Sequence, residues 1–217
     1  MKQILIVGLG RFGLHIAKKL NKMHIQVLGV DSDENMVKAA LPYVTNAEIG
    51  DAGNQEFLKS LGVSNFDVCI VAIGNDFLAS LEVTSYLKEL GAKKVVSRAA
   101  RDLQEKFLLR NGADVVVYPE KLVGNLTAVQ CSSESVLDYI QVSRDFAVFE
   151  IALPEDWIGK SIGEIDVRKK YMVNIIAVKN QDIVNVTLSP SYCFHEGESL
   201  FVIGKDKDIQ KCFHILT

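Results

Sequence analysis

The sequence predicts an α/β protein, in which a doubly wound parallel sheet of the Rossmann type is followed by a second, smaller α+β domain. Short β-branched runs alternate with stretches of helical spacing over roughly the first 130 residues. The strand runs are apolar at consecutive positions, as strands covered on both faces are. A G-x-G-x-x-G turn follows the first of them. We expect domains at residues 1–125 and 139–217, joined by a linker at 126–138.

Six runs are the expected strands of the first domain. They are QILIV (3–7), IQVLGV (25–30), NAEIG (46–50), FDVCIVAI (66–73), KKVVSRA (93–99) and DVVVY (114–118). The clearest helix is expected after the fourth run, where Phe77, Leu81, Leu87 and Leu90 share one face and Gly91 ends the helix. Pro119 presets the start of another helix after the sixth run.

The second domain is richer in strands. Strands are expected at 147–153, 173–178, 183–188 and 198–204, and residues 162–171 have helical spacing. A last helix is expected near the C-terminus, with Asp206 as its N-cap.

Composition excludes several classes of protein. A chain with 48% hydrophobic residues, 24% charged residues and a net charge of −3 is globular and gives no reason to expect nucleic-acid binding. The four cysteines have no metal-ligand spacing, which favours reduced thiols over disulfides or a redox switch. No run reaches the roughly 18 apolar residues that span a bilayer, and the start does not resemble a signal peptide. We expect a cytoplasmic protein that reaches a membrane only through a partner.

The glycine turn predicts a nucleotide site. Gly8, Gly10 and Gly13 follow a strand and open a helix, and Asp31 ends the second strand 18 residues after Gly13. This spacing suits backbone contacts to a pyrophosphate and a carboxylate on the ribose hydroxyls. The alternative is that the glycines serve only tight packing between strand and helix. Asp31 disfavours a 2′-phosphate, which it would repel.

Arg11 places a permanent positive charge inside this turn. A guanidinium clasps a terminal phosphate through two parallel hydrogen bonds, so Arg11 would respond to the number of phosphates on the ligand. The alternative is a solvated arginine at a helix start. That placement is electrostatically poor, because a cation there faces the positive end of the helix dipole.

The remaining residues do not provide the acid or base that a dehydrogenase needs beside its nicotinamide. His195 lies in a turn and His214 near the end of the chain, where surface roles are expected. A small NAD-dependent oxidoreductase and a redox-sensing transcription factor remain the rival hypotheses. The second would need a basic recognition helix, and the most basic run, DVRKKY, is too short for one.

The motifs GLGRFG, VDSDE, GDAGN, VAIGND and YPEKLVG, followed by a small α+β domain, resemble the regulator-of-potassium-conductance family. The chain is most similar to the cytosolic regulatory subunits of Ktr-type potassium transport systems. The resemblance implies a non-catalytic homo-oligomer, an octameric ring under a membrane potassium channel or transporter. It also implies ATP or ADP, or NAD or NADH, in the first domain.

The resemblance also implies roles for single residues. Arg11 would reach the terminal phosphate, the neighbouring Phe12 would be among the nucleotide-binding residues, and Arg98 would supply a second cation for the phosphates. Further nucleotide-binding residues, around the ribose, the adenine and the tip of the fourth strand, would be Asp31, Ser32, Asp33, Asp51, Ala52, Ile73, Gly74 and Asn75.

Glu120 stands in the first turn of the helix that begins at Pro119, where a carboxylate is favourable for the helix alone. By resemblance it would also approach the phosphates of a partner subunit, with a divalent cation between them. In the second domain, the resemblance implies cyclic di-AMP stacked on Ile175 and Ile176, with Lys179 next to it. Several relatives have an arginine at the position of Asn180. The alternative is that Ile175 and Ile176 are core strand residues.

Overall fold

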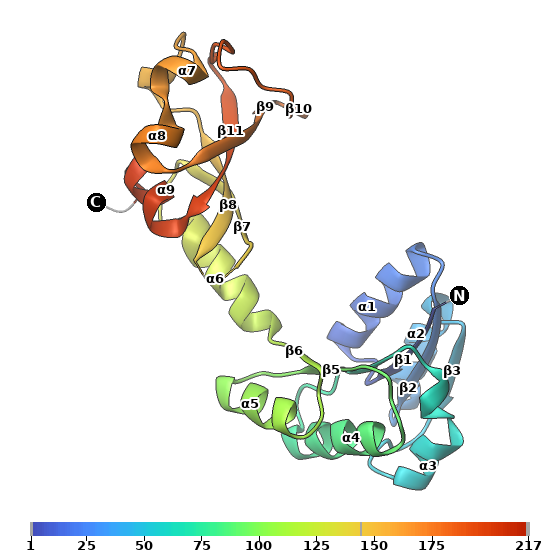
Figure 1. The fold of residues 1–217 in the computed structure, drawn as a ribbon. Helices are drawn as coiled ribbons and strands as arrows, with labels where there is room; N and C mark the ends of the chain where they lie inside the picture. The colour runs from blue at the N-terminus through green and yellow to red at the C-terminus, as the bar shows by residue number, and fades with distance from the viewer. Residues whose placement is uncertain (1, 144, 216–217) are drawn as a thin grey trace. The chain divides into compact units, whose positions relative to one another are not determined.

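The structure, a computed structural model, describes residues 2–143 and 145–215. It divides the chain into two compact units, residues 1–120 and 121–217 (Figure 1). Within the described residues, no helix is long and apolar enough to cross a membrane.

The first unit is built on a six-stranded parallel sheet in the order β3-β2-β1-β4-β5-β6. The strands are β1 (Gln3–Val7), β2 (Gln26–Asp31), β3 (Asn46–Ile49), β4 (Val68–Val71), β5 (Val95–Arg98) and β6 (Val115–Val117). All six strands predicted from the sequence are present. The order reverses between β1 and β4, which confirms the doubly wound fold.

Helices cover both faces of this sheet (Figure 1). They are α1 (Arg11–Lys22), α2 (Glu34–Ala40), α3 (Gln55–Ser60), α4 (Phe77–Glu89) and α5 (Asp102–Arg110), with short 3-10 turns at Leu41–Tyr43 and Val63–Asn65. Ile4 and Ile6 of β1 pack with the core under α1 and α2, whereas Leu5 and Val7 pack with the core under α3 and α4. Consecutive apolar residues are therefore buried on opposite faces, as the sequence predicts.

The helices begin and end where the side chains provide caps. Asp33, Asn54 and Asp76 each accept a hydrogen bond from a backbone N–H in the first turn of the following helix. Gly91 follows α4 at φ +83°, a left-handed conformation that confirms its expected role as the helix stop.

Helix α6 (Pro119–Cys131) begins at Pro119, as predicted, and runs from the first unit into the second. The segment expected as a linker, 126–138, therefore contains the second half of this helix and the start of strand β7 (Val136–Gln141).

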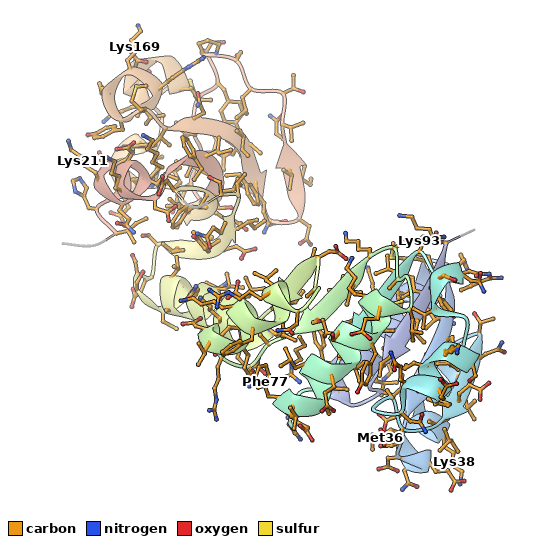
Figure 2. All side chains as sticks on the ribbon, turned by 60° about the horizontal axis from the view of Figure 1, so that its bottom comes forward. Met36, Lys38, Phe77, Lys93, Lys169 and Lys211 are labelled. Carbon is orange, nitrogen blue, oxygen red and sulfur yellow. The ribbon has the colours of Figure 1, made fainter. Side chains whose placement is uncertain are left out.

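The second unit is an antiparallel sheet in the order β10-β9-β11-β8-β7. Its other strands are β8 (Phe146–Ala152), β9 (Asn174–Asn180), β10 (Ile183–Asn185) and β11 (Glu198–Lys205), and its helices are α7 (Ile162–Ile165), α8 (Val167–Tyr171) and α9 (Asp206–Phe213), with a 3-10 turn at Glu155–Trp157. One core joins sheet and helices through Phe149, Phe194 and Ile209, which are almost fully buried. Lys169 on α8 and Lys211 on α9 are exposed on this unit (Figure 2).

The helical segments of the second unit also differ from the predictions. Asp166 takes a left-handed conformation, φ +51°, so the helical stretch at 162–171 is broken into α7 and α8. Asp206 is the first residue of α9 and not its N-cap, which is Lys205. The Asp206 carboxylate instead accepts a hydrogen bond from the Tyr139 hydroxyl, and burial raises the pKa of Asp206.

Candidate nucleotide-binding site

A cavity of about 570 Å³ opens at the carboxyl ends of β1, β2, β4 and β5, at the point where the strand order reverses. Doubly wound sheets bind their ligands at this point. The structure brings most of the predicted residues to the lining: Gly8, Gly10, Arg11, Phe12, Asp31, Ser32, Asp51, Ala52, Ile73, Gly74, Asn75 and Arg98.

A different physical reason accounts for the glycine at each of the three positions of the turn. Gly8 has φ +95°, which side-chain-bearing residues rarely adopt. A Cβ on Gly13 would overlap the carbonyl oxygen of Gly8, so Gly13 serves the packing of α1 on the turn and does not line the cavity. Gly10 has an ordinary φ of −62°, and a Cβ there would meet no atom within 4 Å. Packing within the chain therefore explains Gly8 and Gly13 but not Gly10, and a ligand approaching the backbone would explain it.

Asp31 fixes the turn as well as facing the cavity. Its Oδ2 accepts a hydrogen bond from the Leu9 backbone N–H at 2.7 Å, and its Oδ1 accepts one from the Asp33 N–H at 2.9 Å. Both carboxylate oxygens of Asp31 are thus already engaged within the chain, although each can accept a further hydrogen bond. Asp33 caps α2 and lies outside the lining, while Ser32 contributes to it.

Short loops hold the other predicted residues. Asp51 Oδ1 accepts a hydrogen bond from the Gly53 N–H at 2.8 Å, which closes the loop after β3, and Ala52 is buried against the core. Ile73, Gly74 and Asn75 form the loop between β4 and α4, and Ile73 packs partly into the core.

Arg11 is the first residue of α1 and is exposed. In the described part of the chain no ion pair engages its guanidinium, and the first turn of α1 carries no acidic residue. A cation at a helix start is unfavourable, and nothing on α1 offsets it. An anionic ligand in the cavity would offset the unfavourable charge of Arg11.

Arg98 and Glu120 form an ion pair at the edge of the site. The Glu120 N–H, and then the Arg98 guanidinium and the charge of Arg11, hold the pKa of the Glu120 carboxyl below its usual range. The guanidinium of Arg98 also lies 5.5 Å from the centre of the Phe12 ring. Glu120 does not line the cavity, whereas its ion-pair partner Arg98 does.

Several lining residues were not predicted from the sequence. Gly50, Gly53, Asp76, Ala79 and Val83 complete the cavity. Asp76 could have been found, because an Asp before an apolar helical run is an N-cap signal and Asp76 directly follows Asn75, which was expected at the site. The others follow only from how the loops fold.

The residues proposed as a second-messenger site in the second unit, Ile175, Ile176 and Lys179, all lie on strand β9. Ile175 packs against the core, whereas Ile176 is 41% exposed at a bulge in the pairing of β9 with β11. Lys179 Nζ donates to Glu150 Oε1 at 3.0 Å, and the Ser199 hydroxyl donates to the same oxygen at 2.7 Å. Glu150 and Ser199 are buried, so Lys179 neutralises an internal carboxylate.

In the described part of the chain, the cysteine and histidine side chains do not form a metal site. Cys69, Cys131, Cys193 and Cys212 are free thiols, and burial raises the pKa of both Cys69 and Cys212 to about 12. Across the described residues, no group of three or more His, Cys, Asp or Glu side chains could hold a metal ion. His195 and His214 are exposed, as predicted.

Comparison with known proteins identifies both units. The TrkA-N domain model matches residues 4–119 and the TrkA-C domain model matches residues 147–217. Ktr system potassium uptake protein C of Bacillus subtilis (strain 168) is 37% identical over 210 residues, which cover 97% of this chain and 95% of that protein. Ktr system potassium uptake protein A of Vibrio alginolyticus is 30% identical over 203 residues, covering 94% and 92% respectively.

A solved structure described as the GsuK channel bound to NAD shares the fold. It has a TM-score of 0.69 and 16% sequence identity, and it matches 99% of this chain. The match spans 39% of that longer chain.

Proposed function

Because the chain belongs to the family of proteins built from a TrkA-N and a TrkA-C domain, the potassium-conductance regulators that its motifs resemble, we propose that it is a regulatory subunit that gates a membrane potassium channel or transporter. The adenine nucleotide bound in the cavity of the first unit determines the conformation of this regulatory subunit. The chain would act at the cytoplasmic face of the membrane, bound to its channel partner.

One observation carries the proposal: Gly10 and Arg11 stand side by side in the lining, and neither is explained by the chain itself. Gly10 leaves room where a side chain would fit, and Arg11 is a cation at a helix start that has no ion-pair partner among the residues that the structure describes. A phosphate group would satisfy both, since it needs close backbone approach and negative charge.

The residues present fit such a ligand. The N–H groups of the glycine turn and the start of α1 would hold the inner phosphates, and Asp31 would accept from the ribose hydroxyls. Asp51 and Ala52 would border the adenine, and residues 73–75 would border the ligand from the fourth strand. ATP and ADP differ in the charge that they present to Arg11, whereas NAD ends in a second nucleoside. We therefore favour ATP and ADP as the ligands that Arg11 distinguishes.

Gating requires that the two ligands differ in affinity for the two states of the assembly. A 100-fold difference would supply about 2.7 kcal/mol per site, since about 1.4 kcal/mol corresponds to tenfold. In our proposal, eight such chains in a ring would sum this energy at the pore.

Exposed apolar residues support assembly into a homo-oligomer. Leu78 on α4 and Leu103 on α5 are 63% and 62% exposed, and Phe107, beside Phe77 (labelled in Figure 2), is 38% exposed. Apolar side chains gathered at a surface commonly mark an interface. Light scattering should show a mass well above the 24.0 kDa of one chain. A monomer at micromolar concentration would contradict the ring.

Two finer proposals follow from the resemblance. A divalent cation would join Glu120 to the phosphates of a partner subunit, which requires the carboxylate to leave Arg98. Cyclic di-AMP would bind at Ile176, and Lys179 would reach its phosphates only by leaving Glu150.

The test begins with the nucleotide that co-purifies with the protein, released by heat and identified by mass spectrometry. Calorimetry should then show that ATP and ADP bind with different affinities, and potassium flux through the reconstituted channel should respond to their exchange. Steady NADH turnover with carbonyl substrates would instead support an oxidoreductase.

A further inference from the structure

Helix α1, which covers one face of the parallel sheet (Figure 1), carries a basic face on its outer side. Residues three or four positions apart on a helix lie on the same side of it, and four basic residues follow one another at this spacing: Arg11, His15, Lys18 and Lys22. Lys19 lies beside them. At 1.5 Å per residue this face is about 17 Å long. All of its side chains are exposed except that of Lys18, which is half-buried.

Within the described residues, no ion pair engages a lysine of α1. Residues 1–30 contain five Lys and Arg side chains and no Asp or Glu, although the whole chain has a net charge of −3. The elements that pack most closely on α1 are β1, β2 and the turn Leu41–Tyr43, and their only acidic residue is Asp31. Asp31 lies at the cavity, where both of its oxygens accept backbone hydrogen bonds. The basic face is therefore a local excess of positive charge.

Stability of the helix explains only part of this excess. Lys19 and Lys22 stand in the last turn of α1, where the helix dipole favours a cation. Lys18 stands before that turn, and its Nζ lies 4.8 Å from the centre of the Tyr43 ring. This contact holds the side chain in place but leaves its positive charge without a counterion.

The inner side of α1 is not available for binding. Gly13 and Ala17 are buried, and Leu14 and Ile16 pack against the core formed with β1 and β2. The helix therefore cannot insert an apolar face into a bilayer, as a free amphipathic helix does. It presents a convex row of flexible ammonium groups, which suits a broad surface of diffuse negative charge better than a groove with fixed acceptors.

We propose that Lys18, Lys19 and Lys22 bind anionic phospholipid headgroups, so that the first unit contacts the membrane surface directly. This inference goes beyond the proposed function, which requires only a protein partner in the membrane. One lysine near an anionic membrane surface strengthens binding roughly fivefold, so the three lysines contribute roughly 100-fold. Arg11, at the other end of the basic face, remains at the nucleotide cavity.

Co-sedimentation with vesicles tests the proposal on the intact protein. The vesicles contain phosphatidylglycerol mixed with phosphatidylcholine, or phosphatidylcholine alone. One variant combines Lys18→Gln, Lys19→Gln and Lys22→Gln, and a second carries Arg at the same three positions, which preserves the charge. Soluble polyglutamate serves as a competing polyanion that is not a lipid.

A matched control places Gln at three exposed lysines of α3, α8 and α9, which are Lys59, Lys169 and Lys211 (the last two labelled in Figure 2). It has the same net charge as the Gln variant of α1, so a difference between them reports where the charge lies. Because all exchanged side chains lie at the surface, thermal unfolding should give similar midpoints for all four proteins.

We expect the wild type, the Arg variant and the control to bind phosphatidylglycerol vesicles alike at low salt. The Gln variant of α1 should bind roughly 100-fold more weakly. No protein should bind phosphatidylcholine alone. Binding should weaken between about 0.01 M and about 0.15 M salt, since the Debye length falls from about 30 Å to about 8 Å.

Three results would overturn the proposal. A wild type that does not bind phosphatidylglycerol vesicles at low salt would exclude a lipid contact. Equal losses in the Gln variant of α1 and the control would mean that only net charge matters. Binding to polyglutamate through the three lysines, with no binding to vesicles, would assign the basic face to an acidic protein segment.

Discussion

The proposed site predicts that Gly10→Ala weakens phosphate binding while the fold survives. A Cβ at Gly10 meets no atom of the chain within 4 Å, and its φ of −62° suits alanine. The cost to stability should be about 0.5–1 kcal/mol, the difference between Gly and Ala at an N-cap. The new methyl group would occupy the space through which phosphates approach the turn.

The loss in affinity follows from the contacts that the methyl group blocks. One hydrogen bond to a charged group contributes about 1.5–3 kcal/mol, so ADP should bind roughly 10- to 150-fold more weakly. Adenosine should bind as before. Calorimetry gives both affinities, and thermal unfolding gives the stability of the same samples.

Gly13→Ala is the matched comparison and should behave in the opposite way. Its Cβ would overlap the Gly8 carbonyl oxygen, so the fold should lose at least about 1–3 kcal/mol and the affinities for ADP and adenosine should fall together. Wild-type affinity of Gly10→Ala for ADP would refute the reasoning, because no phosphate could then lie against the turn.

Three further predictions concern charged residues. Arg11→Ala should weaken ATP more than ADP and leave adenosine almost unchanged, and Arg11→Lys should restore part of the difference; equal losses in calorimetry would assign Arg11 to the fold alone. Lys179→Met should lower the free energy of unfolding by about 1.5–3 kcal/mol in urea titration, because it leaves the buried Glu150 carboxylate without its cation; an unchanged midpoint would contradict that role. The Lys88 ammonium, followed by the Val95 N–H, lowers the pKa of Asp114, so Asp114 stabilises the fold above its ordinary pKa of 3.8 and loses this effect as the pH falls. Asp114→Asn should therefore cost up to about 1 kcal/mol at pH 7 and nothing near pH 2, and a cost independent of pH would exclude the ion pair as its cause.

The parallel sheet could be predicted because its signal is local. Strands buried on both faces have consecutive apolar residues, and these runs indicate which residues of the chain form each strand. The antiparallel unit was harder to predict. Strand β7 follows a polar segment, residues 132–135, that favours a linker and hides the strand, although β7 pairs antiparallel with β8, the next strand in the sequence. The break at Asp166 is a left-handed residue inside a pattern of uninterrupted helical spacing.

The candidate site also contains residues that could be predicted from local sequence and residues that could not. The turn and Asp31 were predictable because their spacing lies within one β-α-β unit. The pairs Arg98–Glu120 and Lys179–Glu150 join residues from different elements, and the sequence contains no sign of which cation meets which carboxylate. Both pairs occupy cations that the resemblance assigned to ligands.

The hydrogen bond between Asp31 and the Leu9 N–H bears on how this site could be redesigned or could diverge. Acceptance of a 2′-phosphorylated nucleotide usually requires removal of the acid at this position. Here the same carboxylate anchors the glycine turn through the Leu9 N–H and holds its own loop through the Asp33 N–H. An attempt to change the ribose preference at this position alone would also loosen the phosphate cradle. A new specificity would need a second substitution that restrains the turn.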